Sequence, residues 1–141
     1  MSARTEIPTE AAAQALAIMV AANGHVDERE IQALDELDAF RRLSVSRQRF
    51  IDLARQCLDD FGGPLGQRSW LSAHDMRYLN DVLDAVVEPE LRLHVCRFAA
   101  AVITADGNIA PGERLVYDHV LSRWQISREM VTQAILRDHK P

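Results

Sequence analysis

The chain has 141 residues, of which 48% are hydrophobic and 26% are charged, and it carries a formal net charge of −5. This length suits a single domain, which we expect to span residues 1–141, and the apolar fraction excludes extensive disorder. Two cysteines without a C-x-x-C motif exclude a disulfide scaffold and a cysteine-built zinc site. No apolar run approaches the ~20 residues of a membrane-spanning helix, and no secretory signal is visible, so we expect a cytoplasmic protein without direct membrane insertion. The acidic balance argues against nucleic-acid binding.

Apolar residues recur at helical spacing along the whole chain, and no segment alternates as a strand would. Capping residues and first-turn prolines mark the expected helix starts, at Thr9, Asp27, Ser46, Ser72, Pro89, Pro111 and Ser127. The glycine-rich segment 62–66 interrupts the chain near its midpoint. The sequence therefore predicts an all-α bundle of about seven helices, at residues 9–21, 27–37, 46–61, 72–86, 89–102, 111–124 and 127–135.

A short motif occurs twice between these helices. Residues 22–30 read Ala-Asn-Gly-His-Val-Asp-Glu-Arg-Glu, and residues 105–113 read Ala-Asp-Gly-Asn-Ile-Ala-Pro-Gly-Glu. Aligning Gly24 with Gly107 also pairs Asn23 with Asp106 and Glu30 with Glu113. Each copy follows an alanine-rich apolar helix and precedes an amphipathic one. We therefore expect an internal pseudo-twofold duplication of a helix–loop–helix corner within one domain.

The spacing in each copy is that of the second half of a calcium-binding helix–loop–helix. Such a loop has an oxygen ligand at position 5, glycine at 6, an apolar residue at 8 and glutamate at 12. Its leading ligands at positions 1 and 3 are absent, because Met19 and Ala21, and in the second copy Val102 and Thr104, stand there. A standard calcium loop is therefore excluded. Each copy keeps a half-site, and calcium or another hard divalent cation could need both halves.

The same residues have a structural explanation. Asp27 can cap the following helix while Glu30 closes a capping box. Glu113 lies in the first turn of its helix, where the positive end of the helix dipole stabilises a carboxylate. Asn23 and Asp106 could be turn residues that bond to their own backbone. Capping and metal binding are both open on the residue chemistry alone.

Residues 105–113, preceded by the alanine-rich stretch that begins at Phe98, resemble the characteristic motif of TerB-like domains, and residues 19–30 resemble the other acidic corner of that family. The family includes tellurite-resistance proteins and the N-terminal domain of a membrane-anchored DnaJ-type co-chaperone. The resemblance covers about residues 10–135. It implies an all-helical fold, a role in resistance to tellurite and other stresses, and acidic residues proposed to bind a divalent metal. The implied metal-site candidates are Glu30, Asp106 and Glu113, with Asn23 standing where the family usually has aspartate.

The remaining polar residues do not form a recognisable catalytic site. The five histidines lack paired ligand spacing, and we expect His94 and His119 to be partly buried, hydrogen-bonded structural residues. Cys57 and Cys96 fall on apolar helical faces and are expected in the core. No nucleophile–base arrangement or carboxylate pair is identifiable, and no cofactor-binding loop is present. We therefore predict no enzymatic activity.

Two clusters of charge flank the second and third predicted helices. The arginines at 41, 42, 47 and 49 lack interleaved aromatics, and we interpret them as helix-end residues that face the negative, C-terminal end of a helix dipole and not as a nucleic-acid patch. The acidic residues Asp35, Glu36, Asp38, Asp59 and Asp60 could form a solvated face or a docking surface for a basic protein partner.

Together these patterns favour a non-catalytic, TerB-like stress-response domain that binds a divalent metal through its two loops and engages a protein partner. The alternative is a metal-independent protein-interaction or co-chaperone-type adaptor domain. The resemblance to a membrane-anchored co-chaperone leaves open an association with a membrane protein.

Overall fold

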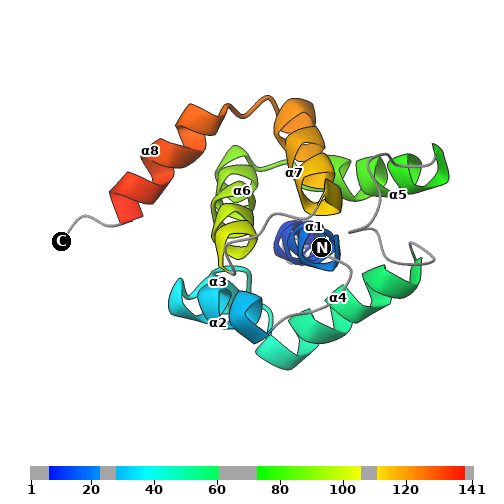
Figure 1. Cartoon of the computed structure of the whole chain (residues 1–141), viewed down its shortest axis with the longest axis horizontal. Helices are drawn as coiled ribbons and strands as arrows, with labels where there is room; N and C mark the ends of the chain where they lie inside the picture. The colour runs from blue at the N-terminus through cyan, green and yellow to red at the C-terminus, as the bar shows by residue number, and fades with distance from the viewer. Residues whose placement is uncertain (1–6, 23–27, 61–72, 106–110, 139–141) are drawn as a thin grey trace, which may run out of the picture.

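The computed structural model describes residues 7–22, 28–60, 73–105 and 111–138. Within these residues the chain forms eight helices and no strand, which confirms the all-α prediction. The helices are α1 (Ile7–Ala21), α2 (Glu28–Glu36), α3 (Ala39–Arg42), α4 (Arg47–Asp60), α5 (Ala73–Asp84), α6 (Pro89–Thr104), α7 (Pro111–Trp124) and α8 (Arg128–Asp138). Their order and arrangement are shown in Figure 1.

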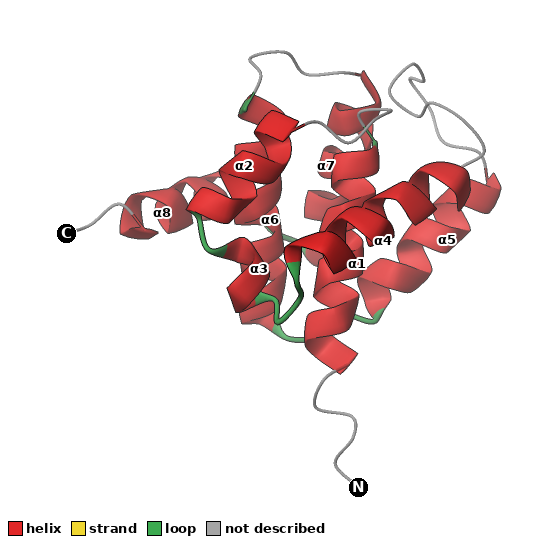
Figure 2. Ribbon diagram, turned by 90° about the horizontal axis from the view of Figure 1, so that it is seen from below, coloured by secondary structure: helices red, strands yellow, loops and turns green. Residues whose placement is uncertain are grey.

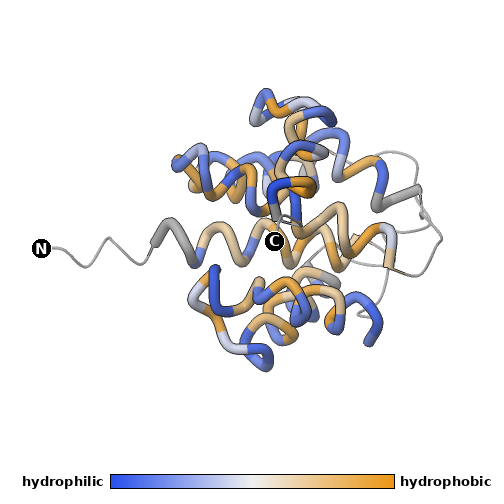
Figure 3. Tube along the Cα trace, turned by 90° about the vertical axis from the view of Figure 1, so that its left-hand side faces the viewer, coloured by the Kyte–Doolittle hydropathy of each residue, from blue (hydrophilic) through white to orange (hydrophobic). Residues whose placement is uncertain are grey.

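The helix α1 lies at the centre of the bundle, because its apolar residues surround the whole helix. Every residue from Ala11 to Ala22 is buried except Gln14, whose side-chain amide donates a 3.3 Å hydrogen bond to the Tyr78 hydroxyl of α5. A helix that is apolar all round must be covered on all sides. The helices α4, α5, α6 and α7 pack on it, as the end-on view in Figure 1 and the hydropathy colouring in Figure 3 show.

The predicted helix starts are correct where local chemistry is strongest. The Ser46 hydroxyl accepts a 3.0 Å hydrogen bond from the Arg49 amide at the start of α4, and the Ser127 hydroxyl accepts one of 3.1 Å from the Met130 amide at the start of α8. Each serine therefore satisfies an N–H group that has no partner within its helix. Pro89 and Pro111 are the first residues of α6 and α7, where a missing N–H costs nothing.

One predicted helix start is wrong, and one short helix was not predicted. Thr9 does not precede the first helix, because α1 begins at Ile7 and tolerates Pro8 in its first turn. The second predicted helix ends at Glu36, one residue before its predicted end, and Asp38 adopts a left-handed backbone conformation with φ of 61°. Aspartate tolerates this conformation better than most residues, and the chain reverses there into the one-turn helix α3.

Several expected features lie outside the described residues. These are the caps Asp27 and Ser72, the glycine-rich segment 62–66 and Phe61 at the end of the third predicted helix. The core contains apolar residues from the predicted helices, among them Leu16, Phe50, Leu79, Phe98 and Val120.

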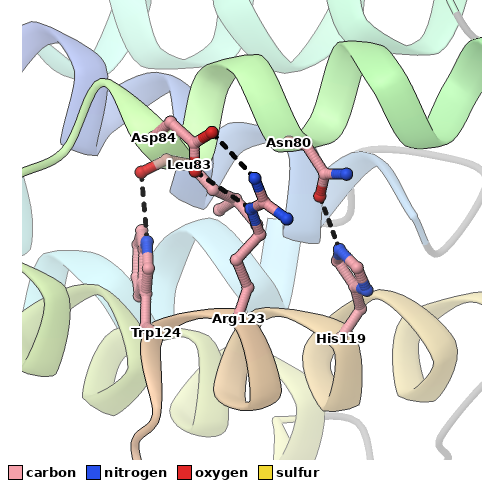
Figure 4. Close-up of polar contacts among 6 residues, drawn as sticks. All are labelled: Asn80, Leu83, Asp84, His119, Arg123 and Trp124. Atoms are coloured by element: carbon pink, nitrogen blue, oxygen red, sulfur yellow. Dashed lines mark hydrogen bonds and ion pairs between the residues drawn. The ribbon is translucent and has the colours of Figure 1, made fainter.

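Three side chains of α7 attach it to the last turns of α5, as Figure 4 shows. The Trp124 indole N–H donates a 3.1 Å hydrogen bond to the carbonyl oxygen of Leu83. The Arg123 guanidinium makes two bonds, of 2.9 and 2.8 Å, to the two carboxylate oxygens of Asp84, and it holds the pKa of that carboxyl below its usual 3.8. The His119 Nε2 lies 2.7 Å from the Asn80 side-chain oxygen. These contacts fix the direction of α7 and therefore the place where the second corner ends.

Candidate metal centre

The two corners begin and end at equivalent points of the structure. The helices α1 and α6 end at Ala21 and Thr104, which are 83 residues apart, and the helices α2 and α7 begin at Glu28 and Pro111, also 83 residues apart. This is the offset that aligns the duplicated motif in the sequence. Each corner therefore joins an apolar helix to a following helix through a segment of equal length.

This equivalence gives two predicted site residues the same helical position. Glu30 is the third residue of α2 and Glu113 is the third residue of α7. Both positions belong to the first turn, where backbone N–H groups are free and the helix dipole favours a carboxylate. The backbone of Glu113 is described, whereas its side chain lies outside the described part of the structure.

Glu30 is fully buried, with 0% of its surface exposed. A buried carboxylate must be hydrogen-bonded, paired or bound to a metal, because desolvation of an isolated charge is costly. Glu30 has a polar interaction partner in the structure, so its burial by itself does not require a metal ion. The sequence predicted a capping or ligating role at this position and gave no indication that the side chain would be buried completely.

The second corner begins at Ala105, which is close to α2, the helix that follows the first corner. Ala105, the residue after α6, shares a shallow pocket with Glu28, Arg29 and Gln32 in the first turns of α2. The helices α2 and α6 also pack on each other, and Figure 2 shows them side by side. The fold therefore brings the beginning of one acidic corner to the end of the other.

The predicted ligand set is only partly described. Asn23 and Asp106 lie outside the described residues, so Glu30 is the one candidate ligand with a described side chain. Among the described side chains, no three histidine, cysteine, aspartate or glutamate residues lie close enough to hold a metal ion. The other three candidate ligands, Asn23, Asp106 and the side chain of Glu113, lie outside the residues that were searched for a metal site.

The histidine and cysteine expectations agree with the structure. His94 and His119 are partly buried. Burial, together with the charge of Arg123, lowers the pKa of His119 below its usual 6.5. Cys57 and Cys96 are buried and are not joined in a disulfide, and desolvation raises the pKa of Cys96 to about 12. A thiol held protonated in this way is a poor nucleophile and a poor metal ligand.

The arginine cluster pairs with acidic residues of neighbouring elements. Arg47 lies 3.7 Å from carboxylate oxygens of both Glu28 and Asp35 of α2, and Arg49 lies 4.0 Å from Glu10 of α1. The interpretation of Arg47 and Arg49 as residues at a helix C-terminus is wrong, because both lie in the first turn of α4. Their carboxylate partners come from helices that the sequence could not place beside them.

Comparison of the chain with protein-family models, with curated proteins and with solved structures found no match. In the described parts of the chain, no helix combines the length and the apolar character needed to cross a membrane.

Sequence reasoning also missed a groove between α6, α7 and α8 that carries a cluster of charged residues. The only sign of this cluster in the sequence was the four-residue spacing of Arg114 and Asp118. Arg128 of α8 comes close to Asp118 only in the folded structure.

Proposed function

We propose that this protein is a TerB-like, non-catalytic stress-response domain that binds a divalent metal between its two acidic corners and engages a protein partner. The observation that carries the proposal is the equivalence of the two corners, in which the bounding helices end and begin with the same 83-residue offset. The motif that resembles the TerB-like family occupies these two corners. Resistance to tellurite or other stresses is the biological role that the resemblance implies.

The chemistry of the corners suits a hard cation. Calcium takes six to eight oxygen ligands, and magnesium takes six oxygens that include several waters. One corner offers one predicted loop ligand and one first-turn glutamate, which is too few for a strong site. Asn23 with Glu30, and Asp106 with Glu113, would together supply four oxygen-bearing side chains. Ala105 and the first turns of α2 line the same shallow pocket, which supports an arrangement in which both corners serve one ion.

In this mechanism the cation acts as a clamp. It would fix the start of α2 relative to the end of α6 and so restrict the motion of the exposed acidic residues Asp35 and Glu36. A surface that is already ordered loses less conformational entropy when it binds a partner. Metal binding would then raise the affinity of α2 for a basic protein surface, with no chemical step at any residue.

Thermal unfolding of the chelator-treated protein, repeated with excess calcium, magnesium, manganese or zinc, tests the metal site. An ion at a hundredfold excess over its dissociation constant adds about 2.7 kcal/mol to the free energy of unfolding, which raises the midpoint by several degrees. We expect this shift for at least one ion, and its loss in Asp106→Asn and Glu113→Gln. The matched control is Glu129→Gln, which removes an exposed first-turn glutamate from α8 and should keep the shift.

The alternative function, a metal-independent interaction domain, makes a different prediction for the same experiment. It is favoured by the first-turn position of Glu30 and by the polar partner that this residue already has. If Glu30 is only a structural cap, Glu30→Gln lowers the midpoint equally with and without added metal. No shift with any of the four ions in the unmodified protein would overturn the metal proposal and leave the adaptor function.

A further inference from the structure

A groove lies where α6, α7 and α8 meet, and it is separate from the pocket beside α2. Its floor is apolar and is formed by Ile103 of α6, Tyr117 of α7, and Val131 and Ile135 of α8. The helices α7 and α8 both pack on α6, and Figure 1 shows them diverging from their connection. The space between them has a volume of about 400 Å³.

The rim of the groove carries more positive than negative charge. The carboxylate of Asp118 is shared by two arginines, with one oxygen 3.8 Å from Arg114 Nε and the other 2.5 Å from Arg128 Nη2. Two guanidinium groups facing one carboxylate leave a surplus of one positive charge. The side chains of Arg114 and Arg128 are 66% and 63% exposed, so both keep N–H groups that an anion from solution can reach.

Tyr117 adds a hydrogen-bond donor inside the groove. The residue is only 9% exposed, and its hydroxyl has no hydrogen-bonding partner among the described residues. Burial raises the pKa of this phenol to about 12, so it remains a protonated donor at neutral pH. A buried donor without a partner is unfavourable and would be satisfied by an acceptor atom of a ligand.

The hydroxyl protons of the two threonines at the groove edge are already used in hydrogen bonds to backbone carbonyl oxygens. The Thr104 hydroxyl donates to the carbonyl oxygen of Ala100 at 3.0 Å, and the Thr132 hydroxyl donates to that of Arg128 at 3.1 Å. Recognition of a ligand in the groove therefore falls to Tyr117 and the two arginines.

The size of the groove favours a small molecule over a docked helix. The residues of α6 that line it run only from 100 to 104, which is about 6 Å of helix. A helix docked through anchors at i, i+4 and i+7 would need about 10 Å of continuous floor. The volume lies instead within the range of about 300–1,000 Å³ that is typical of small-molecule sites.

We propose that this groove binds a small amphipathic carboxylate. Its apolar ring or chain lies on Ile103, Val131 and Ile135, its carboxylate pairs with Arg114 and Arg128, and the Tyr117 hydroxyl donates a hydrogen bond to one carboxylate oxygen. This site is independent of the metal proposed for the corners, because it uses none of the corner carboxylates.

The experiment measures the binding of naphthalene-2-carboxylate to the full chain in buffer that contains a chelator, with naphthalene-2-carboxamide as the neutral probe of the same shape. Fluorescence of the naphthyl group reports binding, and amide chemical shifts locate it. We expect saturable binding that perturbs α6, α7 and α8, with the carboxylate bound about threefold to tenfold more tightly than the amide. Equal affinity for the two probes, or no saturable binding, would overturn the proposal.

Variants distinguish ligand recognition from a structural role of the ion pairs. Arg128→Gln should weaken carboxylate binding about threefold to tenfold and leave amide binding unchanged. Asp118→Asn should strengthen carboxylate binding, because it removes the competing anion, although it breaks the same ion pairs. If Asp118→Asn instead weakens the binding of both probes, the ion pairs only hold α8 in place and the proposal is wrong.

Two further variants complete the test. Arg137→Gln removes one exposed arginine from the same helix outside the groove and should change neither affinity. Tyr117→Phe keeps the apolar floor and removes only the hydroxyl, so it should weaken carboxylate binding even if Arg128→Gln fails to fold. Unchanged carboxylate affinity in both Tyr117→Phe and Arg114→Gln would contradict the assigned contacts.

Discussion

The Trp124 indole of α7 donates its N–H to the carbonyl oxygen of Leu83, 41 residues earlier in the chain, at 3.1 Å. Leu83 lies in the last turn of α5, and its carbonyl oxygen also accepts a 3.1 Å hydrogen bond from the Val86 amide just after the helix. Trp124 is only 5% exposed, and the guanidinium carbon of Arg92 lies 5.6 Å from the centroid of its ring. One side chain thus joins the end of α7 to the end of α5 and to the start of α6.

The first prediction concerns Trp124. Trp124→Phe keeps an aromatic ring but removes the hydrogen bond and part of the buried volume, so we expect it to lower the free energy of unfolding by about 1–3 kcal/mol. Urea denaturation followed by far-ultraviolet circular dichroism measures the change without relying on tryptophan fluorescence. The control Val87→Ala trims a side chain that is 63% exposed and should stay within about 0.5 kcal/mol of the unmodified protein.

The second prediction concerns the pH dependence of His119. Burial lowers the pKa of His119 in the folded state, so the unfolded chain binds this proton more tightly. As the pH falls through 6.5, protonation therefore favours unfolding, and stability is lost until the pH passes below the folded-state pKa. We expect the midpoint of unfolding to fall more steeply between pH 7 and pH 5 in the unmodified protein than in His119→Gln.

Other groups also contribute to the pH dependence of the unfolding midpoint. Their contribution is the same in the unmodified protein and in His119→Gln, so the difference between the two curves reports His119 alone. The Arg123–Asp84 pair beside His119 stays charged in both proteins throughout this interval, since the pKa of Asp84 lies below 3.8. Parallel curves for the two proteins would show that the environment of His119 does not disfavour its charged form.

The third prediction tests the central position of α1. Ala17 is 0% exposed on a helix that contacts four others, so Ala17→Leu must displace neighbouring side chains or helices. We expect a loss of about 1–3 kcal/mol in the free energy of unfolding, because adding methylenes to a filled core forces strained packing. Ala73→Leu makes the same change at an exposed position of α5 and should be nearly neutral. Similar losses of stability in both variants would mean that the core around Ala17 is not tightly packed and that the burial of α1 does not explain the loss.

Much of the secondary structure was predictable because its signals are local. Ser46 and Ser127 precede helices and accept hydrogen bonds from amides three residues later, and Pro89 and Pro111 start helices at the expected residues. The left-handed Asp38 and the short helix α3 were not predictable in the same way. The apolar pattern continues through Leu37, and only packing against the core decides that the chain turns there.

The equivalence of the two corners was predictable from the sequence, whereas the metal site itself stays a prediction. The duplicated motif identified Glu30 and Glu113 as equivalent residues, and the helix boundaries of the structure agree with that alignment. The complete burial of Glu30 and the pocket that Ala105 shares with α2 depend on how α2 packs against α6, which no local pattern reports.

The sequence by itself determined the fold class, most helix starts and the equivalence of the two corners, because each depends on residues within a few positions of one another. Only the tertiary structure decided which distant residues meet: Arg123 with Asp84, Arg47 with α2, and Arg128 with Asp118 beside Tyr117. These contacts arise when α4, α5 and α7 pack on the apolar α1 and when α2 and α8 pack on α6. The direction in which a helix packs is set by the shape of its whole buried face. The sequence therefore shows which charged residues the chain contains, but the fold decides which of them meet in the groove.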